Sequence, residues 1–181
     1  MKSKILWLVG ISSVSALLLF SLAKNKASAQ SANVETTRNI QYAVRENSNA
    51  NLTSLDIYAP TNAKNAPVMI MIHGGGWRNG DKANRGLNNN KVPFFSENGF
   101  IYISINYRLS PAIQHPAHIE DVAEAVAWVD DNIGKYGGDK NKIFVMGHSA
   151  GAHLAALVAA DQSRLKKHKK DLSIIKGVIL L

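Results

Sequence analysis

A serine at position 149 stands in a segment that could supply the nucleophile of a hydrolase. The segment reads Gly147-His148-Ser149-Ala150-Gly151 and fits the pattern G-x-S-x-G. It directly follows an apolar run that predicts a strand and directly precedes an apolar segment that predicts a helix. Glycines two positions before and after the serine let the strand and the helix pass closely while a strained turn exposes the hydroxyl. We therefore predict a nucleophile elbow with Ser149 as the attacking residue, in preference to an N-cap serine.

A second segment could bind the negative charge that such an attack creates. His73-Gly74-Gly75-Gly76-Trp77 follows the apolar run 68–72. Three consecutive glycines let backbone N–H groups approach a substrate without interference from side chains. Each such donor aimed at a developing alkoxide lowers the barrier by about 3 kcal/mol. Because both segments follow strands and serve the same chemistry, we interpret this one as an oxyanion loop and not as an ordinary glycine turn.

Apolar runs without charge predict the strands that must position these two segments. Such runs are typical of a parallel sheet whose two faces are covered by helices. The predicted strands are residues 68–72, 100–105, 143–146 and 178–181, and the predicted helices are 92–98, 119–133 and 150–160, the last buried nearly all round. Alternating segments at 40–44 and 52–58 predict an antiparallel hairpin at a sheet edge, with residues 30–37 loose before it. The expected fold class is α/β with a mainly parallel sheet.

The first 29 residues predict an export segment. Lys2 and Lys4 precede the uncharged apolar run Ile5–Ala23, and Ala27-Ser28-Ala29 offers a small-x-small cleavage pattern. Since the run is also close to the length that spans a bilayer, an uncleaved membrane anchor is the alternative. Both predict an exported protein that is periplasmic, secreted or membrane-anchored, with residues 30–181 forming the hydrolase part.

Composition narrows the classes of partner and of chemistry. The formal net charge is +8, but much of it lies in the export segment and in the basic run 164–170, and the remaining body is near neutral. A solvated connection is the preferred interpretation of that run, and nothing indicates nucleic-acid binding. The chain has no cysteine, so disulfides, thiol catalysis and zinc-thiolate sites are excluded.

The two motifs together resemble those of α/β-hydrolase esterases with an H-G-G-G-W loop. This group includes hormone-sensitive-lipase-like esterases and related carboxylesterase, feruloyl-esterase-like and kynurenine-formamidase-like proteins. Further similar segments lie between residues 40 and 181: Leu55-Asp56-Ile57-Tyr58, Asn106-Tyr107-Arg108-Leu109, Pro116 with Asp121, and Gly137-Gly138-Asp139. Ala150-Gly151-Ala152 after the serine departs from the Tyr-Gly-Gly of prolyl-oligopeptidase relatives and disfavours a peptidase.

The resemblance implies a carboxylic-ester hydrolase of the esterase or lipase type that acts on small-molecule esters. It implies an oxyanion hole made by the N–H groups of Gly75, Gly76 and Ala150, and structural roles for His73, Asp121 and Asp139. It implies no metal and no organic cofactor. An aryl-formamidase-like amide hydrolase is the main alternative activity.

The remaining triad residues are not found in the expected places. The fold places an Asp or Glu and then a His after the serine, but the residues that follow Ser149 offer Asp161, Asp171 and His168 beside the basic run. A displaced base at His115 or His118 is a minor alternative, and His148 and His153 favour packing roles. Because an unpaired apolar strand at 178–181 would be unusual, we expect a truncated reading frame that lacks the last strands. The chain would then be poorly active or a non-catalytic fragment of an exported hydrolase.

Overall fold

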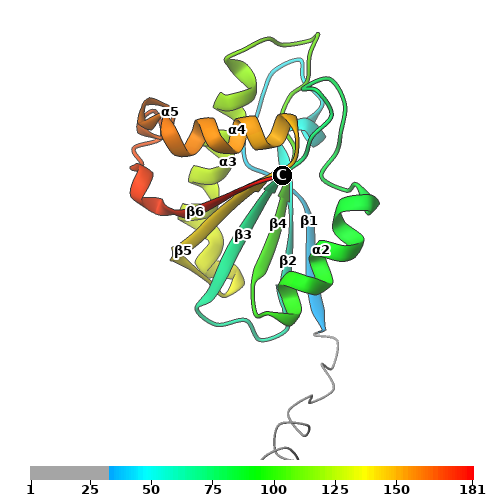
Figure 1. The fold of residues 1–181 in the computed structure, drawn as a ribbon, viewed down its shortest axis with the longest axis vertical. Coiled ribbons are helices and arrows are strands. Elements are labelled where there is room, and N and C mark those ends of the chain that lie inside the picture. Colours follow the sequence, from blue (N-terminus) through cyan, green and yellow to red (C-terminus); the bar gives the residue numbers. More distant parts are fainter. Residues whose placement is uncertain (1–32) are drawn as a thin grey trace, which may run out of the picture. The chain divides into compact units, whose positions relative to one another are not determined.

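A six-stranded mixed sheet organises the computed structural model, which describes residues 33–181 (Figure 1). The predicted export segment lies outside the described residues. In spatial order the strands are β1 (Val34–Gln41), β2 (Ser54–Pro60), β4 (Ile101–Ile105), β3 (Ala66–Ile72), β5 (Gly138–Gly147) and β6 (Ile175–Leu180). β2 pairs antiparallel with both β1 and β4, and the other pairs are parallel. The mainly parallel sheet is confirmed.

Helices cover both faces of this sheet, as predicted. Along β3, Val68, Ile70 and Ile72 face one way and Met69 and Met71 the other, because successive strand residues point to opposite faces. The isoleucine face packs against α3 (Ala117–Asn132) and α4 (Ala150–Ala160), and the methionine face packs against α2 (Arg85–Glu97). The remaining helices are short: α5 (Gln162–Lys166) and the 3₁₀ turns η1 (Ala50–Thr53), η2 (Ile133–Tyr136) and η3 (Leu172–Ile174).

The predicted edge hairpin exists, but its first strand was placed wrongly. β1 covers Val34–Gln41, so residues 34–37, expected to be loose, are paired with β2, and residues 42–44 are not in the strand. Because most β1 side chains are exposed on an edge strand, their polar composition does not oppose pairing. Tyr42 is instead buried, and its hydroxyl donates to the carbonyl of Asn106 over 2.9 Å.

Two helices also differ from expectation. α2 begins at Arg85, well before the predicted residue 92, because its asparagine-rich first half carries no apolar periodicity that the sequence could reveal. α4 has the predicted bounds but is not buried all round. Ala150, Gly151, Leu154, Ala155 and Val158 are buried, whereas His153 is exposed.

The basic run 164–170 lies on α5 and just after it, and two of its lysines pair with carboxylates of α3. Lys167 contacts Glu120 over 2.7 Å, and Lys170 contacts Asp130 over 2.7 Å. These pairs favour the interpretation of the run as a surface connection, since part of its charge already has partners within the fold. No helix within residues 33–181 is long and apolar enough to cross a membrane.

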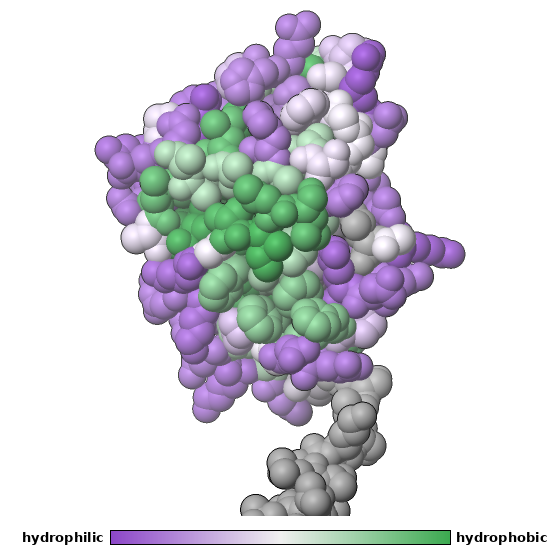
Figure 2. All heavy atoms as spheres, in the orientation of Figure 1, coloured by the Kyte–Doolittle hydropathy of each residue, from purple (hydrophilic) through white to green (hydrophobic). Residues whose placement is uncertain are grey.

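β6 forms one edge of the sheet and exposes apolar side chains there. Val178, Ile179 and Leu180 are between 37% and 54% exposed. Figure 2 shows an apolar area on the face where β6 lies in Figure 1. The predicted apolar strand edge at residues 178–181 is therefore present, in parallel pairing with β5.

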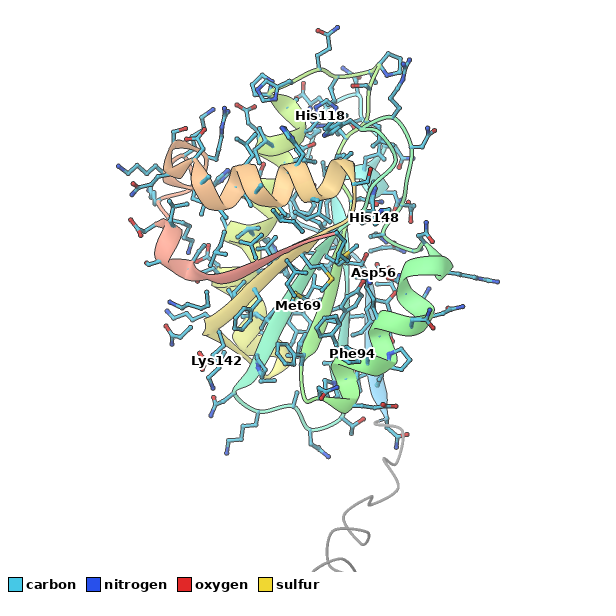
Figure 3. All side chains as sticks on the ribbon, viewed as in Figure 1. Asp56, Met69, Phe94, His118, Lys142 and His148 are labelled. Atoms are coloured by element: carbon cyan, nitrogen blue, oxygen red, sulfur yellow. The ribbon has the colours of Figure 1, made fainter. Side chains whose placement is uncertain are left out.

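A buried ion pair lies under the methionine face of the sheet, where Figure 3 labels Asp56. Lys82 and Asp56 are almost fully buried, and the ammonium of Lys82 contacts Asp56 Oδ1 over 2.7 Å. The same ammonium donates to Asn39 Oδ1, while Asp56 Oδ2 has no hydrogen-bond partner. The backbone around Lys82 is also bound, because its N–H donates to Asn106 Oδ1 and its carbonyl accepts from Asn88. This cluster fixes the segment that follows the glycine loop to the sheet.

Replacing Lys82 by Met should destabilise the fold strongly, because Asp56 would then be a buried carboxylate without a counter-charge. We expect the free energy of unfolding to fall by about 3–5 kcal/mol, measured by urea denaturation. The double variant Asp56→Leu/Lys82→Met should lose less, since no uncompensated charge remains. Lys64→Met, on an exposed lysine, is the matched control, and equal stability of the Lys82 and Lys64 variants would contradict the assignment.

Candidate active site

Ser149 occupies a sharp turn between the end of β5 and the start of α4. Its backbone has φ 52° and ψ −117°, in the region of positive φ that residues with a side chain rarely adopt. A Cβ on Gly147 would lie 2.2 Å from the carbonyl oxygen of Gly151, and one on Gly151 would lie 2.2 Å from that of Ile72. The turn therefore needs both glycines, and the predicted strained elbow is confirmed.

The glycine loop follows β3 and is also built on positive φ angles. Gly75 has φ 113°, and a Cβ there would lie 2.1 Å from the carbonyl oxygen of Asn79. The loop closes through hydrogen bonds from the N–H groups of Arg78 and Asn79 to the carbonyl of Gly75. Gly76 has φ 60°, and the space where its side chain would be is empty within 4 Å. The loop thus presents bare backbone to an open region.

The structure brings the two predicted motifs together. A Cβ placed on Gly74 would lie 3.2 Å from Ser149 Cβ and 2.7 Å from the carbonyl oxygen of His148. The N–H of His148 donates to the carbonyl of Ile72 at the end of β3. Within residues 33–181 the N–H groups of Gly75 and Gly76 donate to no backbone acceptor, and that of Ala150 is in the first turn of a helix, where no intrahelical acceptor exists. These are the three donors that the family resemblance implies.

His73 supports the loop from the protein side. Its Nδ1 donates to the carbonyl of Gly74 over 2.8 Å, and its ring stacks on Tyr107 with centroids 4.5 Å apart. The Tyr107 hydroxyl donates to the His73 carbonyl over 3.1 Å. Burial lowers the pKa of His73 and raises the pKa of Tyr107 to about 12, so both side chains are uncharged at neutral pH. His73 therefore has the contacts of a structural residue.

Asp121 fixes the segment that leads into α3. It is fully buried and accepts two hydrogen bonds of 2.8 Å from the guanidinium of Arg108, whose pKa these bonds raise. The N–H of Arg108 also donates to it.

Asp139 lies at the opposite end of β5 from Ser149, where it accepts from the N–H of Asn141 and pairs with Lys142. Both carboxylates are thus occupied by structural contacts.

A cavity of about 570 Å³ opens beside the glycine loop. Trp77 closes one side, with its ring edge-to-face against His153 of α4 at a centroid distance of 5.5 Å. The lining comes from the loop, from the segment before α3 and from the first turns of α4: Gly76, Trp77, Arg78, Ser110, Pro111, Gln114, His115, His118, His153 and Leu154. The cavity therefore shares Gly76 and the start of α4 with the surroundings of Ser149.

No histidine of the described residues is hydrogen-bonded to the hydroxyl of Ser149, which is exposed. His118 Nε2 is instead 3.1 Å from the hydroxyl of Ser110, and burial lowers its pKa. Figure 3 places His118 at the start of α3 and His148 beside the carboxyl ends of the strands. The displaced base considered for His115 or His118 therefore has no contact in its favour.

The acidic residues after the serine do not complete a triad in the described part of the chain either. Asp161 and Asp171 each accept from a serine N–H two residues ahead, Ser163 and Ser173, and so stabilise local turns. No group of three or more metal-binding side chains occurs within residues 33–181.

The sequence assigned no role to several residues that shape this site, although Trp77 and Asn106 lie in segments that it marked. Trp77 adopts φ 59°, Lys82 is buried under the loop, and Asn106 donates to Asp81 and accepts from the N–H of Lys82. The charged residues Asp81 and Lys82, a few positions after the glycine loop, were the available signal, but the partner of Lys82 is the distant Asp56. No sequence feature marked Ser110 as a residue of this site.

Comparison with known proteins places these features in one family. The family model BD-FAE matches residues 55–177. Esterase LipQ of Mycobacterium tuberculosis is 48% identical over 99 residues, which cover 53% of this chain and 22% of LipQ. A probable isoprenylcysteine alpha-carbonyl methylesterase of rice, Oryza sativa subsp. japonica, is 34% identical over 66% of this chain and 28% of its own length.

Solved esterase structures have the same fold. Esterase B of Lactobacillus rhamnosis is 28% identical, with a TM-score of 0.63 over 91% of this chain and 52% of that chain. An esterase of Pyrobaculum calidifontis is 27% identical, with a TM-score of 0.61 over 92% of this chain and 48% of that chain. The expected α/β-hydrolase fold is confirmed, and the chain spans about half the length of these structures.

The strain at Ser149 predicts an unusual stability change. Ser149→Gly should raise the free energy of unfolding by about 1 kcal/mol, because glycine adopts the positive φ without a steric cost. Ser149→Ala removes the same hydroxyl but keeps the Cβ, so it is the matched control and should leave stability nearly unchanged. Chemical denaturation of both variants measures the difference, and a glycine variant no more stable than the alanine variant would refute the strain.

Proposed function

We propose that this chain, which belongs to the BD-FAE family, is built to hydrolyse carboxylic esters of small molecules through an acyl-enzyme on Ser149. The observation that carries the proposal is that the two motifs lie against each other. A Cβ added to Gly74 would lie 3.2 Å from Ser149 Cβ. An exposed hydroxyl, three N–H donors without a backbone acceptor and a nearby cavity are then found at the same end of the sheet.

In the proposed reaction the Ser149 oxygen attacks the ester carbonyl and forms a tetrahedral intermediate. The N–H groups of Gly75, Gly76 and Ala150 donate to its oxyanion, aided by the positive end of the α4 dipole. The alcohol leaves with a proton, an acyl group stays on Ser149, and water releases it as the acid. Each oxyanion donor contributes about 3 kcal/mol to this stabilisation.

A general base must accept the Ser149 proton, and none is assigned among the described residues. Serine hydrolases use a histidine that is hydrogen-bonded to the nucleophile for this step. The described histidines are occupied elsewhere or lack a contact with Ser149. This part of the fold therefore supplies the nucleophile and the oxyanion donors in the proposed reaction.

The esterase relatives support ester hydrolysis over the two alternatives. The rice and mycobacterial relatives and the solved structures all carry esterase names, and none of these points to an aryl formamidase or a non-catalytic protein. The same names favour small-molecule esters as the substrate class.

We also propose export through residues 1–29, supported by the positive start, the apolar run Ile5–Ala23 and the Ala27-Ser28-Ala29 pattern. Either cleavage or an uncleaved anchor is compatible with these residues. Sequencing the N-terminus of the expressed protein distinguishes them, and a protein retained in the cytoplasm with Met1 intact would refute export.

A serine-directed alkyl phosphonate tests the proposed nucleophile on the full chain. We expect one phosphonyl group on the peptide that contains Ser149, because the N–H donors stabilise the charged phosphonyl oxygen as they would an oxyanion. Oxyanion stabilisation without a base retains on the order of 10³-fold acceleration, so labelling should be slow but detectable by mass spectrometry.

Ser149→Ala should abolish this label, and Ser110→Ala, the other serine beside the cavity, should retain it. A label that stays in the Ser149→Ala variant would refute the assignment. Rapid labelling together with turnover of a short-chain ester would instead reveal a general base that acts on Ser149 in the full chain.

A further inference from the structure

The cavity beside Ser149 has a chemical character that the esterase mechanism does not require. Its wall is mainly apolar, formed by Trp77, Pro111 and Leu154 with the bare backbone of Gly76. Its charged or titratable members are all bases: the guanidinium of Arg78 and three imidazoles. No carboxylate lines it. A cavity of this kind binds an apolar body and selects for the sign of any charge that the body carries.

Arg78 is the permanent cation at this cavity. Its side chain is exposed and makes no ion pair or hydrogen bond with any residue of 33–181. Arg108 and Arg164, by contrast, are both paired with carboxylates at 2.8 Å. The Arg78 backbone is nevertheless fixed, since its N–H donates to the carbonyl of Gly75 inside the oxyanion loop. The guanidinium is therefore free to bind a ligand two residues from a proposed oxyanion donor.

The neighbouring carboxylates do not neutralise it. Asp81 accepts from the side chains of Asn51 and Asn106, Glu120 pairs with Lys167, and Asp121 is held by Arg108. Glu120 and Asp121 are thus paired with cations, Asp81 is held by amide hydrogen bonds, and none of the three lines the cavity. The guanidinium of Arg78 therefore has no carboxylate beside it on the cavity wall.

His118 adds a fixed neutral dipole to the same wall. The hydroxyl of Ser110 donates to the carbonyl of Ile113 over 3.0 Å, so Nε2–H of His118 donates to the Ser110 oxygen. Both groups are satisfied within the protein and do not compete for an anionic ligand. Arg78 is left as the permanently charged group on the wall that can pair with one.

We propose that this cavity binds the part of an ester substrate that carries a carboxylate, with Arg78 pairing with that carboxylate and Trp77 packing against the apolar body. The planar guanidinium matches a carboxylate through two parallel hydrogen bonds, which favours a carboxylate over a point-like anion. The substrate assignment rests on the proposed function of Ser149, but the binding of the carboxylate does not. Esters with a cationic group are disfavoured at the same wall.

A matched pair of ligands tests this on the full chain. 4-Phenylbutyrate and 4-phenylbutanamide have the same size and differ in charge, and isothermal titration measures each affinity directly. We expect the carboxylate to bind about tenfold more tightly, because a charge-assisted, bidentate pair is stronger than a neutral hydrogen bond. Arg78→Gln should remove this preference and Arg78→Lys should retain part of it. Arg38→Gln, the same charge change on exposed β1, is the control and should leave it intact.

Three results would overturn the proposal: equal affinity for the two ligands, no binding of either, or a preference that survives Arg78→Gln. Tighter binding of 3-phenylpropyl phosphate than of 4-phenylbutyrate would also overturn it, by assigning the site to phosphate. Circular dichroism confirms that each variant is folded. Phosphonate labelling of Ser149 is measured separately, so loss of labelling with retained carboxylate binding refutes the esterase proposal alone.

Discussion

The close passage of three backbone segments at the carboxyl ends of β3 and β5 is the constraint on which the rest of the site depends. Gly147 and Gly151 approach each other, and Gly151 approaches the carbonyl of Ile72, at distances where a Cβ does not fit. This crowding forces Ser149 into a positive φ and lifts its side chain away from the sheet. It also places the glycine loop beside the same residue, since that loop continues β3. One packing constraint thus creates both the exposed nucleophile and its neighbours.

Buried polar contacts hold the loop against this crowded point. His73 and Tyr107 fix its first residues from within the core, and the Lys82–Asp56 pair fixes the segment that follows it. Buried ion pairs contribute little net stability but strongly resist the loss of either partner. The buried contacts on both sides of the glycine loop instead fix its geometry. They hold the N–H groups of Gly75 and Gly76 without a backbone acceptor, although backbone donors ordinarily find one. Preorganised donors of this kind do not have to reorient when charge develops.

The sequence revealed the parts of the fold whose local pattern agrees with their final environment. The buried strands, the elbow and α4 follow from apolar runs and glycine spacing, which report directly on burial and close approach. β1 and the first half of α2 could not be found in this way, because their polar side chains face solvent and their structure comes from pairing and packing with distant residues. Lys82 and Arg78 are both positively charged residues a short distance after the glycine loop. Only the fold shows that Lys82 is a buried structural cation and that Arg78 lines a cavity.

The elbow is also hydrogen-bonded to the sheet edge. The N–H of Ser149 donates to the carbonyl of Leu181 over 2.8 Å, and the N–H of Leu181 donates to the carbonyl of Gly147 over 2.9 Å. The turn is bound on its other side as well, because the N–H of His148 donates to the carbonyl of Ile72 at the end of β3. Two neighbouring residues of the turn thus bind backbone on opposite sides of β5. A change in the pairing of either neighbouring segment would be transmitted to the backbone of the nucleophile through a single hydrogen bond.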